Sequence, residues 1–164
     1  MTLTTTFKLL KAEKACESGY KKLRKNLKGI EINEPINLLT ILESNGFDDA
    51  LWALRATEQN CDRIARLMAV DFAESVLHIW TAQYPNDNRP ALAIQAARNF
   101  ANGLITRQNL VAAARAARAA WDAAWDATRA AARDAWDAAG DAAWDAEREK
   151  QITIFKSYLQ PEEK

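Results

Sequence analysis

The sequence contains few of the residues from which catalytic and metal sites are usually built. It has one histidine, two cysteines, five glycines and four prolines among 164 residues. Cys16 and Cys61 stand apart, without a CxxC pair or histidines at zinc-binding spacing, which is typical of a reducing compartment. The sequence has no glycine-rich phosphate loop, GxSxG elbow or HExxH motif. We therefore expect a protein that is not an enzyme and that has no metal and no cofactor.

The sequence also lacks long apolar runs and a net charge. No run approaches the roughly 18 apolar residues of a membrane-spanning helix, and lysines interrupt the short apolar stretch near the first residue. We therefore expect no transmembrane helix, no signal peptide and a cytoplasmic protein. The 22 basic and 22 acidic side chains balance, whereas a strong nucleic-acid binder is usually basic overall. This balance argues against a nucleic-acid partner.

The balanced charges are unevenly distributed along the chain. Residues 1–29 hold eight lysines and arginines against two glutamates, and residues 30–60 hold six acidic side chains against one arginine. Such blocks attract each other, and we interpret them as complementary surface segments. A phosphate-binding role for the basic block is the weaker alternative.

Two residues that resemble catalytic groups have simpler explanations. His78 follows Glu74 by four residues, which places both side chains on one face of a helix and predicts a surface pair. Cys61 lies where a helix is expected to begin, but it has no neighbouring histidine or second cysteine to activate it as a nucleophile. Neither residue predicts catalysis.

Apolar residues at spacings of three and four predict helices through most of the chain. Capping residues, glycine and proline set the expected boundaries. These residues are Asn45-Gly46, Asn60, Pro90, Gly103 and Thr106. The expected helices cover residues 7–28, 36–44, 47–56, 61–83, 90–102 and 107–158. No stretch alternates with period two, so the fold class is all-α and we expect no sheet.

We predict one all-α domain over residues 1–164, a helical bundle with a long Ala-rich C-terminal helix. Short amphipathic helices occupy residues 1–105, the Ala/Trp/Asp/Arg helical region occupies 106–159, and a tail occupies 160–164. The length of the chain suits one domain, and no linker rich in glycine, serine or proline divides it.

The Ala-rich region is too long for one straight helix in a compact domain. Residues 112–146 include 19 alanines. A helix over 107–158 would be about 78 Å long, whereas a domain of this size is about 40 Å across. Beyond residue 150, Ile152, Phe155 and Leu159 move to the side of the helix opposite the Ala face. We predict a kink, a break or a change of packing partner near residues 146–151, with Gly140 as the second candidate.

The tryptophans of this region lie beside its Ala face. Trp125 and Trp136 lie at the border of that face, and Trp144 lies over the charged side. Two interpretations stay open. The tryptophans either cover the edge of the intramolecular core, or they form part of a surface that binds a protein partner, because Trp and Arg are frequent in binding hot spots.

Aspartates occupy the other side of the same region and alternate with arginines. Pairs at spacings of three and four favour a solvated ion-pair face. The alternative is an acidic line that imitates the phosphates of a nucleic acid. The aspartates that we name with the three tryptophans as candidate partner-binding residues are Asp126, Asp134, Asp137, Asp141 and Asp145.

A polar loop separates the helices expected at 61–83 and 90–102. Asp87 and Arg89 lie in this loop, and Pro90 is a favoured residue in the first turn of a helix. We predict that the three residues form a structural loop clamp.

Five sequence blocks follow one another in a fixed order. They are KACESGY, GFDDALWALRA, DRIARLMAVDFAESVLHI, YPNDNRPALAIQAARNFANGLIT and, after the Ala-rich helix, AEREKQITIFKSYL. This succession resembles a family of Ala-, Trp- and Asp-rich immunity proteins of bacterial toxin–immunity systems, which also occurs in phages. The resemblance covers about residues 12–159, and its most specific block is NDNRPALAIQAARNFANG. It implies an all-α cytoplasmic protein that neutralises a toxin by binding it, and it brings no catalytic residues.

Three functions are consistent with these observations. The first is a non-enzymatic immunity or inhibitor protein that contacts a toxin or effector directly. The alternative is a phage-encoded anti-defence inhibitor of a host nuclease system, which would use the Asp-rich helix as an acidic substitute for nucleic acid. A structural homodimer is the third and weakest.

Overall fold

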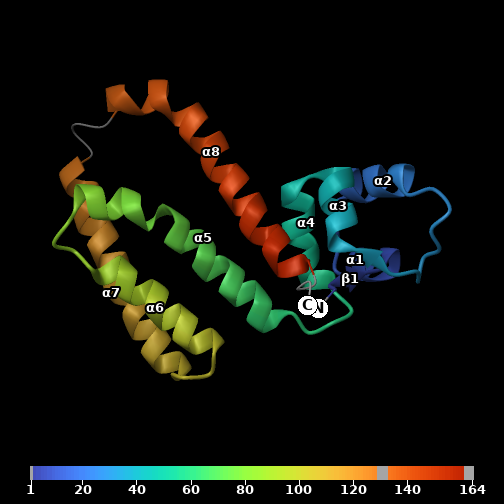
Figure 1. Cartoon of the computed structure of the whole chain (residues 1–164), viewed down its shortest axis with the longest axis horizontal. Helices are drawn as coiled ribbons and strands as arrows, with labels where there is room; N and C mark the ends of the chain where they lie inside the picture. Colours follow the sequence, from blue (N-terminus) through green and yellow to red (C-terminus); the bar gives the residue numbers. More distant parts are fainter. Residues whose placement is uncertain (1, 129–132, 161–164) are drawn as a thin grey trace. The chain divides into compact units, whose positions relative to one another are not determined.

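The computed structural model describes residues 2–128 and 133–160; for residue 117 and residues 119–144 within these ranges, it describes the backbone alone. The described chain is mostly helical, which confirms the all-α class (Figure 1). Its elements are β1 (Thr4–Thr5), α1 (Phe7–Ala12), α2 (Glu17–Asn26), β2 (Ile36–Asn37), α3 (Leu38–Asn45), α4 (Phe47–Ala53), a 3-10 turn η1 (Leu54–Ala56), α5 (Asp62–Gln83), α6 (Arg89–Ala101), α7 (Arg107–Thr128) and α8 (Arg133–Leu159).

The chain forms two compact units. Unit 1 comprises Met1–Ala65 and Phe155–Lys164, and unit 2 comprises Arg66–Ile154. Both boundaries fall inside helices, because α5 and α8 each contribute residues to both units. The single domain expected over residues 1–164 stays a prediction.

The prediction of one helix over residues 7–28 is wrong, because this segment forms two helices, α1 and α2. Lys14 adopts the left-handed conformation (φ 61°), which ends the first helix. The thiol Sγ of Cys16 then accepts the N–H of Gly19 at 3.4 Å and caps the second. The apolar spacing is continuous across this break, so periodicity gave no sign of it.

Unit 1 also contains a small sheet, which corrects the expectation of none. β1 and β2 pair antiparallel, with Thr4 opposite Asn37 and Thr5 opposite Ile36. The strands are two residues long, too short to show an alternating pattern. Consequently α3 begins at Leu38 rather than residue 36, capped by the Asn37 side chain. It ends at Asn45 before Gly46 (φ 101°), as predicted.

The core of unit 1 combines residues from its first helices and from the end of α8. Phe155 and Leu159 of α8 are fully buried there, and the Phe155 ring packs edge-on against Phe47, with centroids 5.6 Å apart. The other fully buried apolar side chains of this unit are Leu3, Phe7, Ile36, Leu38, Ile41, Ala50 and Ala53. Apolar burial on this scale is the main source of stability for so small a unit.

Unit 2 is built from α5, α6, α7 and most of α8. The bounds of α5 and α6 and the start of α7 agree with prediction to within one residue, whereas the end of α7 at Thr128 and the start of α8 at Arg133 were not predicted. The Asn60 side chain accepts the N–H of Asp62 at the start of α5, and Thr106 Oγ1 accepts the N–H of Asn109 at the start of α7. Gly103, with φ 72°, follows the end of α6. Helices α6 and α7 pack side by side, joined by this short connection (Figure 1).

The predicted change near residues 146–151 takes the form of a change of packing partner. Helix α8 runs through Gly140 and residues 146–151 as one continuous helix, so the predicted break occurs at neither position, and a kink stays a prediction. Instead, Glu147 contacts Ser75 within unit 2, while Phe155 belongs to unit 1. The reversal of the apolar side therefore marks where the helix passes from one unit to the other. Helix α7 ends at Thr128 and α8 begins at Arg133.

Across the described residues, no helix combines the length and the apolar character that a membrane span requires.

Candidate partner-binding surface

Arg98 of α6 joins two carboxylates of α5 inside unit 2. Its Nη2 donates to Asp71 Oδ1 at 2.8 Å and to Glu74 Oε2 at 2.5 Å. The hydrogen bond to Asp71, with the charges of both carboxylates, raises the pKa of Arg98 above its ordinary value. Asp71 and Glu74 are three residues apart on one helix face, so this arginine fixes α6 against that face.

His78 and Cys61 both lack the surroundings of a catalytic group. His78 Nδ1 lies 2.9 Å from the carbonyl oxygen of Ser75, and the pair expected between His78 and Glu74 is not formed. Glu74 pairs instead with Arg98, whose charge is permanent. The Cys61 thiol is buried and donates to the Leu54 carbonyl at 3.0 Å.

Asp87 and Arg89, two residues of the predicted loop clamp, contact each other at the start of α6, and a clamping role for them and Pro90 stays a prediction. Arg89 Nε and Nη2 donate to the two carboxylate oxygens of Asp87 at 2.9 and 2.8 Å, and the Arg89 backbone N–H donates to Asp87 Oδ1 at 3.1 Å. The hydrogen bond from the Arg89 side chain holds the pKa of Asp87 below its ordinary value. Trp80 Nε1 donates to the Asp87 carbonyl at 3.2 Å, which ties the loop to α5. Pro90 is in the first turn of α6. The charged groups of Arg89 and Asp87 are thus paired with each other.

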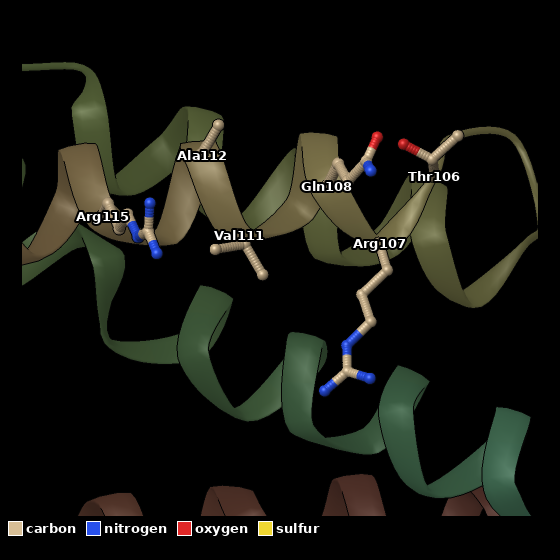
Figure 2. Close-up of a pocket in the computed structure, with 6 residues that line it drawn as sticks. All are labelled: Thr106, Arg107, Gln108, Val111, Ala112 and Arg115. Atoms are coloured by element: carbon tan, nitrogen blue, oxygen red, sulfur yellow. The ribbon is translucent and has the colours of Figure 1, made fainter.

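A hollow of about 740 Å³ lies along the first turns of α7 (Figure 2). Figure 2 shows Arg107 and Val111 projecting from one side of the helix, with Ala112 on the other. Arg115 follows Val111 by four residues, so the three longer side chains share a face. We call this surface the α7 groove; its lining residues are Thr106, Arg107, Gln108, Val111, Ala112 and Arg115.

The α7 groove combines positive charge with exposed apolar side chains. Arg107 and Arg115 are exposed, and neither forms an ion pair with a described residue. Between them, Val111 is 37% exposed. Leu104, just before the cap of α7, is 71% exposed. Arginine beside apolar surface is a combination found at protein–protein interfaces.

Most of the partner-binding residues predicted from the sequence lie outside the described side chains. These are Trp125, Trp136, Trp144, Asp126, Asp134, Asp137 and Asp141. Asp145 is described and exposed. All eight stay predictions.

The sequence-based reasoning missed the α7 groove. The sequence does contain a signal for this surface, because Arg107, Val111 and Arg115 follow one another at intervals of four and so lie on one face of a helix. Across the described residues, no group of three or more histidine, cysteine or acidic side chains could hold a metal ion. The described features therefore favour a contact surface over a reactive centre.

Comparisons with known proteins place the chain in a family. The family model described as "Imm-5 like putative immunity protein" matches residues 55–151. Comparison with curated proteins gave no match, and comparison with solved structures gave none. The matched range covers more than half of the chain and includes α5, α6, α7 and most of α8. The chain therefore belongs to the Imm-5 like immunity protein family, the kind of family that its sequence blocks resemble.

Proposed function

We propose that the protein is a non-enzymatic immunity protein that neutralises a protein toxin by direct contact in the cytoplasm. The observation that carries this proposal is the family match over residues 55–151. That range contains almost all of unit 2, including the α7 groove. The groove offers the exposed arginines and apolar side chains that a protein partner can cover.

The surroundings of the reactive side chains support binding rather than catalysis. His78 contacts a backbone carbonyl, and Cys61 is buried against another. Cys16 and Cys61 are both free thiols, which supports the proposed cytoplasmic location. A protein that acts by contact needs a stable surface, and the Arg98 contacts between α5 and α6 provide a fixed scaffold for one.

The test is protection of cells from candidate toxins, which are taken from the proteins encoded by the genes that neighbour this one and are tested one at a time. Co-expression of the full chain with one of these toxins should restore growth, and the purified pair should elute as a stable complex whose mass by light scattering fits one copy of each. Toxin that is released from the complex should have an unchanged mass by mass spectrometry, because the proposed inhibition involves binding and no covalent modification. Absence of protection, or protection accompanied by a covalent change in the toxin, would contradict the proposal.

The alternative of a phage-encoded anti-defence inhibitor depends on the acidic line of the Ala-rich helix. Of the five aspartates named for that helix, Asp145 is exposed. The side chains of the other four lie outside the described ones: Asp126, Asp134, Asp137 and Asp141. No contact in the described part of the structure favours this alternative, so it stays a prediction, as does the homodimer.

A further inference from the structure

Resting on the proposed function, we propose that the α7 groove docks an acidic, amphipathic segment of the toxin. The segment would present two carboxylates separated by about two helical turns, with an apolar side chain between them. This assigns both a surface on the immunity protein and the chemistry of the partner that fits it.

The spacing of the groove residues defines the partner's spacing. Arg107, Val111 and Arg115 follow one another at intervals of four, on one face of α7. At 1.5 Å of rise per residue, the two arginines are separated by about 12 Å along the helix. A partner helix with acidic residues eight positions apart and an apolar residue midway matches this pattern.

The two arginines differ from most other described arginines in forming no ion pair with a described residue. Arg89 pairs with Asp87, and Arg98 pairs with two carboxylates of α5. Arg24 and Arg55 lie over aromatic rings. Arg107 and Arg115, in contrast, are exposed and form no ion pair with a described residue. Their charge is available to a partner.

The chemistry of the groove selects an acidic partner. A guanidinium binds a carboxylate through two parallel hydrogen bonds, a stronger and more specific contact than a single neutral one. Val111 between the arginines, and Leu104 before them, add apolar surface whose burial favours association. A basic segment would bring like charges together at both arginines, which opposes binding.

The experiment measures binding of designed helical peptides to the full chain by fluorescence anisotropy. One peptide carries glutamates eight positions apart with leucine midway, and its control carries glutamines in place of the glutamates. The wild-type protein should bind the acidic peptide at least about tenfold more tightly than the control. The preference should shrink as salt is added, because screening weakens exposed charge pairs.

Two charge-matched double variants locate the binding. Arg107→Glu with Arg115→Glu should weaken binding of the acidic peptide at least about tenfold. Lys25→Glu with Lys28→Glu, which changes the net charge equally at exposed positions in unit 1, should leave it unchanged. An acidic residue is favourable near a helix N-terminus, so Arg107→Glu should not unfold α7. Circular dichroism and the urea midpoint of each variant check this.

Each outcome decides the proposal. Equal affinity for the two peptides, or equal loss in both double variants, would overturn the acidic-segment assignment. Dimers of the wild type that are absent in the Arg107→Glu/Arg115→Glu variant would overturn it in favour of a second copy of the chain. A chain that protects cells but ignores the acidic peptide would overturn this surface and leave the proposed function intact. Selective peptide binding by a chain that gives no protection would contradict the proposed function alone.

Discussion

At the scale of single residues, Arg98 is a side chain whose loss would take its positive charge away from two neighbouring carboxylates. It is 30% exposed and holds Asp71 and Glu74, which lie three residues apart on α5. Without the arginine, two like charges on one helix face repel each other, and one of them is partly shielded from water. Sequence alone did not predict this contact, because residues 71 and 98 are brought together by the packing of α5 on α6.

Replacing Arg98 with methionine should therefore lower the free energy of unfolding by about 1.5–3 kcal/mol, the range for hydrogen bonds to charged groups. The measurement is urea unfolding followed by circular dichroism. The matched control is Lys21→Met, which removes an ion pair with Glu17 in which both side chains are more than 70% exposed. Exposed pairs contribute about 0–1 kcal/mol. Equal effects of the two substitutions would contradict this account of Arg98.

At the scale of elements, the approach of α2 to α4 depends on a residue without a side chain. A Cβ atom at Gly19 would lie 2.6 Å from Asp49 Oδ2 and 3.0 Å from Cys16 Sγ. Asp49 cannot move away freely, because Asn45 Nδ2 donates to it at 2.7 Å and also donates to the Gly19 carbonyl at 2.9 Å. The glycine thus permits a close contact between helices that alanine would disturb.

Gly19→Ala should lower the free energy of unfolding by about 1 kcal/mol, at the low end of the range for an overpacked contact. Helix propensity alone would have the opposite effect, because alanine in place of glycine stabilises a helix by up to about 1 kcal/mol. In an Asp49→Ala background the same change should be neutral or stabilising, because the clashing carboxylate is gone. Thermal and urea unfolding of the four proteins in this cycle measure the difference. An identical loss in both backgrounds would show that the contact with Asp49 is not the cause.

The elements also show what local sequence can and cannot predict. The end of α3, the starts and ends of α5 and α6, and the start of α7 were predictable, because asparagine, threonine, proline and glycine act within one turn of the helix that they begin or end. The break after α1 was not, because the apolar stripe continues through Lys14 while its backbone turns left-handed. The two short strands were missed because each pairs with residues about thirty positions away.

The α7 groove shows the same limit at a surface. The spacing of Arg107, Val111 and Arg115 is visible in the sequence, but the exposure of these side chains is a property of the folded chain. The Asp87–Arg89 contact was predictable because its partners are two residues apart. Candidate sites formed by local residues can thus be predicted, whereas those that depend on tertiary packing cannot.

At the scale of the whole molecule, the family match and the compact units have different boundaries. The match ends at residue 151, whereas the final part of α8, from Phe155, supplies buried residues to unit 1. The apolar side chains move to the opposite face of α8 after residue 150 because this part of the helix packs into the core of unit 1. The part of α8 up to Ile154 and the part from Phe155 therefore belong to two different compact units.

Ending the chain after Ile154 should loosen unit 1 while leaving the helix pair α5–α6 protected. Loss of Phe155 and Leu159 leaves Phe47 without its aromatic neighbour and opens a cavity in the core. Hydrogen exchange measured by mass spectrometry should accelerate at least about tenfold in α3 and α4. Exchange in α6 should change less, because Arg98 and its two carboxylates all lie before the new end. A chain that ends after Gln160 retains both buried residues and serves as the control. Unchanged exchange in α4 of the shorter chain would mean that the end of α8 is not needed for the core of unit 1.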